Sequence, residues 1–178
     1  MTAARAPGLT VLGIDPGTRR LGWGVVRREG TRLLHVAHGV IAAKESLPLA
    51  ERLVIMERGL LEVLAGHTVD MASVESLFFA HDPQAAAKLG HARGVALLVC
   101  ARAGLDVAEY APARVKRTVA GHGQADKKQV AEMMRVILSL RAAPASDAAD
   151  ALAIAVTHLQ AVPLRAAVHR AGVASGKV

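Results

Sequence analysis

The sequence predicts an α/β protein with a mixed five-stranded sheet, made of three antiparallel hairpin strands followed by two parallel strands, and flanked by helices on both faces. Two observations lead to this fold class. Residues 10–42 contain apolar, strand-like runs separated by turn residues, and from residue 47 onward helix-like and strand-like segments alternate. The length of 178 residues is typical of one domain. We expect this domain to span residues 10–162, between a flexible N-terminus (1–9) and a flexible basic tail (163–178).

The first three strands are marked by apolar runs and by turn residues between them. Thr10 to Ile14 is an apolar run that ends in Asp15-Pro16-Gly17, which is typical of a buried strand followed by a turn. Leu21 to Arg28 and Thr31 to Ala42 are strand-like, and Glu29-Gly30 between them is a two-residue hairpin signal. These three segments therefore predict an antiparallel meander.

The rest of the chain alternates helices with two short strands. Leucines and Met56 recur at helical spacing and predict a helix over about 47–65. Met71 to Val74 is a short strand that ends at Glu75, and Pro83 to Ala103 predicts a long helix with Gly104 as its stop. Val107 to Tyr110 predicts the last strand, followed by helices near 112–120, 126–140 and 146–160.

The composition excludes several kinds of site. The single cysteine, Cys100, excludes an intramolecular disulfide and a cysteine-based zinc site, and His35 and His38 are too few to suggest zinc binding. Residues 1–10 contain no apolar stretch that resembles a signal peptide, and the longest apolar run, Gly94 to Ala101, is too short to span a bilayer. We therefore expect a cytoplasmic protein without membrane partners.

The positive charge is concentrated in one part of the chain. The 22 Lys and Arg residues exceed the 15 Asp and Glu residues, for a net charge of +7. Residues 111–141 alone carry seven basic groups against Asp126 and Glu132. A local basic block favours a polyphosphate partner such as a nucleic acid, although a solvated basic surface has the same composition.

Four acidic residues stand at strand ends or at the start of a late helix. Asp15 and Glu75 each end a predicted strand, and Asp147 and Asp150 lie three residues apart at the start of the last predicted helix. Alone, each has an ordinary explanation in turn chemistry, surface exposure or helix capping. In a sheet of this kind, however, functional groups gather at strand ends and helix termini. Converging carboxylates bind Mg²⁺ or Mn²⁺, and beside a basic block the matching chemistry is two-metal phosphodiester hydrolysis.

The chain has four aromatic residues, and two of them are adjacent. Phe78 and Phe79 follow Glu75 closely, in a predicted loop from Ser76 to His81. Packing in the core is the ordinary explanation for a phenylalanine. The alternative is that one ring faces outward and stacks on an unpaired base or enters between base steps.

Together these residues resemble the RuvC family of bacterial Holliday-junction endonucleases, from about Leu12 to His158. Asp-Pro-Gly alone is a weak signal, because sugar kinases and actin-like ATPases also start with an Asp-x-Gly turn, but the set of motifs in this order is specific. The set comprises Gly-Ile-Asp-Pro-Gly (13–17), Leu21-Gly-Trp-Gly, Glu75-Ser-Leu-Phe-Phe, Lys88-Leu-Gly-His-Ala-Arg-Gly, Val115-Lys-Arg-Thr-Val-Ala-Gly, Lys127-Lys128 and Ser146-Asp-Ala-Ala-Asp-Ala-Leu-Ala. The resemblance implies an RNase H-like fold.

The resemblance also implies an activity and its residues. It implies a homodimer that nicks two strands of a four-way junction symmetrically during recombination and repair, leaves 5′-phosphate ends, and works with the RuvA–RuvB branch-migration complex. Two Mg²⁺ ions per active site are implied, with Mn²⁺ as a substitute. The implied catalytic and metal-binding residues are Asp15, Glu75, Asp147 and Asp150, although some relatives carry His in place of Asp147. The implied DNA-binding residues are Phe78, Lys116, Lys127 and Lys128.

Three other functions share part of this pattern. An RNase H-fold nuclease of the YqgF-like kind also starts with Asp-Pro-Gly, and would cleave structured RNA instead of a DNA junction. An actin-like domain would bind nucleotide, but this chain is short for the second lobe that closes over ATP. A DNA-bridging dimer without catalysis is the third alternative, and loss of activity on substitution of a single carboxylate would exclude it.

Overall fold

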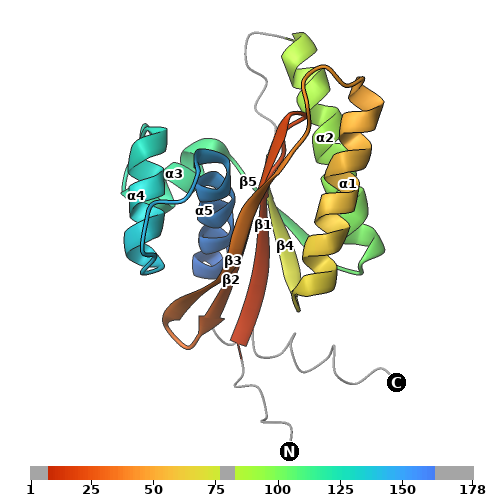
Figure 1. Ribbon diagram of the computed structural model, residues 1–178. Coiled ribbons are helices and arrows are strands. Elements are labelled where there is room, and N and C mark those ends of the chain that lie inside the picture. Colours follow the sequence, from red (N-terminus) through yellow and green to blue (C-terminus); the bar gives the residue numbers. More distant parts are fainter. Residues whose placement is uncertain (1–7, 77–82, 163–178) are drawn as a thin grey trace, which may run out of the picture.

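The computed structural model describes residues 8–76 and 83–162, and its centre is one mixed five-stranded sheet (Figure 1). The strand order is β3-β2-β1-β4-β5. Strands β1 (Gly8–Asp15), β2 (Arg20–Glu29) and β3 (Arg32–Ala42) are antiparallel neighbours, while β4 (Met71–Glu75) runs parallel to β1, and β5 (Val107–Tyr110) parallel to β4. The predicted fold class is confirmed.

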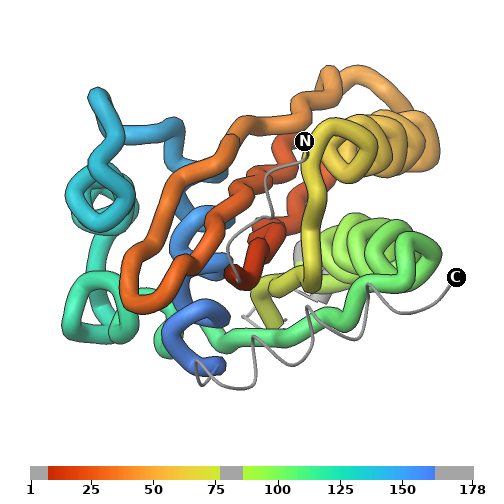
Figure 2. The backbone as a smooth tube through the Cα atoms, turned by 90° about the horizontal axis from the view of Figure 1, so that it is seen from below, coloured from red at the N-terminus to blue at the C-terminus, as the bar shows by residue number. Residues whose placement is uncertain are grey.

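Helices cover both faces of the sheet. Helices α1 (Leu49–Gly66) and α2 (Pro83–Arg102) lie on one face, and α3 (Pro112–Ala120), α4 (Lys127–Ile137) and α5 (Ser146–Ala161) lie on the other (Figures 1 and 2). Within the described ranges, no helix is long and apolar enough to cross a membrane.

Several predicted boundaries are wrong by one to three residues. Strand β1 begins at Gly8 instead of Thr10, because the pairing with β2 extends to Gly8 opposite Glu29. The hairpin loop is Gly30-Thr31 instead of Glu29-Gly30, since Glu29 still pairs with Arg32. Helix α4 ends at Ile137 instead of residue 140, where the chain turns through Ser139 at a φ of 52°.

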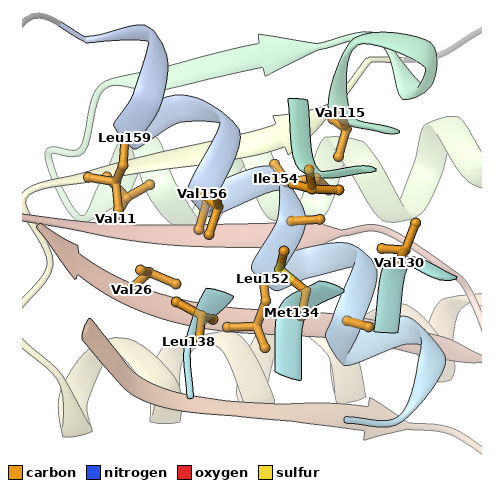
Figure 3. Packing of buried hydrophobic residues seen from close by; sticks show 14 of the residues in the cluster. Val11, Val26, Val115, Val130, Met134, Leu138, Leu152, Ile154, Val156 and Leu159 are labelled. Carbon is orange, nitrogen blue, oxygen red and sulfur yellow. The ribbon is translucent and has the colours of Figure 1, made fainter. Parts of the chain in front are cut away.

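The sheet separates two hydrophobic cores, and strand alternation assigns each side chain to one of them. Leu9 and Val11 belong to the core beneath α3, α4 and α5, part of which is shown in Figure 3. Leu12 and Ile14 belong to the core beneath α1 and α2. Because successive residues of a strand face opposite sides, Asp15 lies on the same face of β1 as Leu9 and Val11.

Helix α5 lies directly against β1 and β2. Eleven of its 16 residues are buried. A Cβ added to Gly13 would lie 2.0 Å from the carbonyl oxygen of Ala151, and one added to Gly22 would lie 1.9 Å from that of Asp147. Only glycine fits at these two positions, so the sequence places the start of α5 next to the end of β1.

Candidate active site

Asp15 and Glu75 end two neighbouring parallel strands. The register of β1 and β4 pairs Ile14 with Val74, so the next residue of each strand lies at the same level of the sheet. Met71 of β4 packs in the core beneath α5, and by alternation Glu75 faces that side too. Both carboxylates therefore point toward the face that α5 covers.

The two carboxylates meet a third acid and two lysines around one cavity of about 250 Å³. Asp150 enters from the first turns of α5, Lys116 from α3, and Lys127 from the first position of α4. The apolar part of the wall consists of Pro112, Val115, Val130 and Ile154. Five of the predicted site residues, from five elements, thus surround one hollow.

Burial and mutual repulsion raise the pKa values of these three acids. Burial, followed by the negative charges of Glu75 and Asp150, raises the pKa of Asp15 from 3.8 to about 8. Burial also raises the pKa of Glu75, and the charge of Asp150 adds to that increase. The pKa of Asp150 is raised by burial as well. An added cation would remove this repulsion, because it favours the charged forms of all three groups.

The two lysines lower the electrostatic cost of the acidic cluster. Lys127 Nζ lies 3.6 Å from Oδ2 of Asp150, and Lys116 opposes the increase in the pKa of Glu75. The position of Lys127 is set by the start of α4, where Asp126 and Gln129 form a reciprocal capping box. Both ammonium groups therefore stand beside the acids at the wall of the same cavity.

Asp147 does not line this cavity. It lies in the first turn of α5, and its Oδ2 accepts a hydrogen bond of 2.5 Å from Nε of Arg20, the first residue of β2. Its charge still acts on the cavity, because it contributes to raising the pKa values of Asp15 and Asp150. Arg20 is a residue that the sequence did not indicate, since 127 positions separate it from Asp147.

The four carboxylates are chemically suited to bind a hard divalent cation. Their oxygens are the ligands that Mg²⁺ and Mn²⁺ prefer. Burial, more than mutual repulsion, raises the pKa values of Asp15, Glu75 and Asp150, so a bound cation would offset the cost of ionising them there. In the described residues, no three His, Cys, Asp or Glu side chains already stand at the spacing that holds a metal ion. Two of the four instead face protein cations, Asp147 with Arg20 and Asp150 with Lys127.

The other predicted DNA-binding residues lie apart from the cavity or outside the described ranges. Lys128 lines a separate hollow of about 410 Å³ with His122 and Glu132. Phe78 and Phe79 fall within residues 77–82, outside the described residues. Sequence reasoning also missed the apolar wall, because Val115, Val130 and Ile154 look like ordinary core residues of amphipathic helices.

Comparison with known proteins gives concordant matches. A family model described as crossover junction endodeoxyribonuclease RuvC matches residues 11–158. A protein of that name from Sorangium cellulosum is 58% identical over 164 residues, which cover 92% of each chain. The solved structure of T. thermophilus RuvC in complex with Holliday junction substrate is 38% identical, with a TM-score of 0.76, covering 85% of this chain and 93% of that one. The yeast mitochondrial Holliday junction resolvase, 12% identical with a TM-score of 0.62, covers 94% of this chain and 83% of its own and shares the fold.

Proposed function

The chain belongs to the crossover junction endodeoxyribonuclease RuvC family, and from this premise we propose that it resolves four-way DNA junctions by nicking two strands symmetrically. The family is one of metal-dependent nucleases. The observation that carries the proposal is the single cavity around which Asp15, Glu75 and Asp150 stand beside Lys116 and Lys127. An acidic centre with basic neighbours is the arrangement that phosphodiester hydrolysis requires.

The proposal assigns a role to each carboxylate. Asp15, Glu75 and Asp150 hold divalent cations from their places around the cavity, and Asp147 joins them from the first turn of α5. We propose two Mg²⁺ ions per active site, with Mn²⁺ as a substitute. When bound, such ions activate a water molecule and stabilise the leaving oxygen. The apolar wall, which includes Ile154, limits the water around the reacting phosphate.

Basic residues supply the affinity for DNA in this proposal. Lys116 and Lys127 contact the phosphate at the cavity, and Lys128, the second residue of α4, contacts the DNA backbone from the separate hollow that it lines. Phe78, in the segment after Glu75, stacks on a base or enters a base step at the junction. The family further supports a homodimer, whose two sites would cut two strands, and an association with the RuvA–RuvB branch-migration complex.

Incision of a synthetic four-way junction tests this function, with a linear duplex of equal sequence as the control substrate. With Mg²⁺ the wild-type protein should nick two opposed strands of the junction, and ligase should seal the product because its ends carry 5′-phosphates. Asp15→Asn and Glu75→Gln should abolish cleavage and retain junction binding, because an amide keeps the shape of the side chain but lacks the charge that the cation needs. Glu62→Gln, an exposed change on α1 across the sheet, is the matched control and should cleave normally.

Three outcomes would contradict the proposal. Cleavage of structured RNA without cleavage of the junction would favour the YqgF-like activity instead. Full activity in Asp15→Asn would remove that carboxylate from the metal site. A DNA-bridging protein without catalysis would show no incision by the wild type at all.

A further inference from the structure

We propose that Arg20 is a positioning residue that takes the place of a cation at Asp147 in the metal-free protein, and that it competes with a divalent ion for this carboxylate. The inference rests on the proposed function, because it concerns the metal site of that function. Arg20 would thereby set the concentration of divalent cation at which Asp147 joins the other three carboxylates around the ion.

The first support is the contact itself. Nε of Arg20 donates to Oδ2 of Asp147 at 2.5 Å, and this carboxylate, alone among the four, does not line the cavity. The Asp147 side chain is only 23% exposed, whereas that of Arg20 is 55% exposed. The arginine therefore covers a mostly buried acid from the solvent side, and it is free to leave without disturbing the core.

The second support is that the backbones on both sides are held in place. Gly22, two residues after Arg20, lies so close to α5 that an added Cβ would be 1.9 Å from the carbonyl oxygen of Asp147. Arg20 itself stays in register with β3, opposite Ala42. Since neither backbone has room to shift, a change of partner at Asp147 requires only side-chain rotation.

The third support is that the ion pair has no evident structural purpose. Asp147 is in the first turn of α5, where the helix dipole already favours a negative charge. An ion pair with an arginine as exposed as this one adds little to the stability of a folded protein. Its effect is on the site instead, because it holds one carboxylate of the cluster against an arginine at a place that does not line the cavity.

The test compares Arg20→Met with Arg19→Met in the full chain without DNA. Both variants remove one positive charge from adjacent residues, but Arg19 pairs with Glu45 instead of an acid of the site. Titration with Mn²⁺, followed by the electron paramagnetic resonance of the free ion, gives the binding isotherm. Arg20→Met should bind Mn²⁺ about fivefold more tightly than wild type, the factor that corresponds to ~1 kcal/mol of lost competition. Arg19→Met should bind like wild type.

Two further variants make the result specific to Asp147. In an Asp147→Asn background, Arg20→Met should no longer change the Mn²⁺ affinity, because the contested carboxylate is gone. Arg20→Lys, which keeps the charge, should stay close to wild type. Thermal melting in EDTA checks that each variant is folded, and Arg20→Gln replaces Arg20→Met if the latter is not.

The outcomes separate this inference from the proposed function. If Arg20→Met binds Mn²⁺ like wild type, if Arg19→Met tightens binding equally, or if the effect survives in Asp147→Asn, the inference is wrong while the metal site stands. If Asp15→Asn binds Mn²⁺ as well as wild type, the metal site itself is not where we place it, and the role of Arg20 fails with it.

Discussion

The stability of the metal-free protein should fall as the pH rises from 5 to 7, and Asp15→Asn should remove the part of this dependence that Asp15 contributes. Burial and the charges of Glu75 and Asp150 raise the pKa of Asp15 in the folded protein to about 8, from 3.8. Between these two values the unfolded chain has lost a proton that the folded chain keeps. The folded state thus binds more protons, so raising the pH favours unfolding until the pH exceeds about 8.

The expected size follows from one retained proton. The free energy of unfolding should decrease by about 1.4 kcal/mol per pH unit, or about 3 kcal/mol between pH 5 and pH 7. Glu75 and Asp150 have raised pKa values too, and their contributions have the same sign. Asparagine cannot ionise, so Asp15→Asn removes the contribution of Asp15 and leaves those of Glu75 and Asp150.

Urea unfolding at pH 5, 6 and 7 in EDTA measures this for both proteins. The wild-type free energy of unfolding should fall across the series, while that of Asp15→Asn should fall less steeply by about 1.4 kcal/mol per pH unit. Saturating Mg²⁺ should flatten the wild-type series, because the cation replaces the protons on the acids. Equal slopes for wild type and Asp15→Asn in EDTA would refute the argument, since they would show that Asp15 titrates alike in the folded and unfolded chains.

Three other predictions test the neighbourhood of the site. Lys116→Ala and Lys127→Ala should each weaken junction cleavage or binding. Each should also flatten the slope of log affinity against log salt concentration by about one unit per lost phosphate contact. If slopes and cleavage are unchanged, the two lysines are solvated surface charges without a partner. Gly22→Ala should reduce the free energy of unfolding by ~1–3 kcal/mol and impair cleavage, because the added Cβ meets the backbone at the start of α5. A denaturant unfolding curve that matches that of the wild type would contradict this. Phe78→Ala should lose about ten- to a hundredfold in cleavage at unchanged melting temperature, as loss of one base stack predicts, with Phe79→Ala as the control that lowers melting instead; the opposite pattern would reverse the two roles.

Most of the fold was predictable because local signals agree with one another. Asp15-Pro16-Gly17 ends a buried strand, and the structure ends β1 at Asp15. The alternation of helix and strand after residue 47 predicted the parallel part of the sheet, which β4 and β5 form. The boundary errors arose where contacts beyond the local sequence determine where an element ends. The turn at Ser139 shortens α4, and strand pairing moves the hairpin loop by one residue.

The candidate site was predictable only in part. Asp15 and Glu75 could be found because both end strands, and the cavity brings them together with Asp150 and two lysines. Arg20 could not be found, because its contact with Asp147 joins two segments far apart in the chain. No local pattern distinguishes an arginine that pairs with a site carboxylate from one, such as Arg19, that pairs with Glu45 at the surface.

Glycines in the sheet and alanines in α5 determine where the acids of the site lie. Asp147 and Asp150 reach the end of β1 only because α5 lies almost in backbone contact with the sheet, which Gly13 and Gly22 permit. On the helix side, the buried surface is rich in alanine, including Ala148, Ala151 and Ala155. Larger side chains on either surface would lift α5 from the sheet and carry both acids away from Asp15 and Glu75. The run Ser146-Asp-Ala-Ala-Asp-Ala-Leu-Ala therefore serves packing through its alanines, and in the proposed function it also supplies metal ligands through its two aspartates. The alanines bring α5 close enough to the sheet for those aspartates to stand near the ends of β1 and β4.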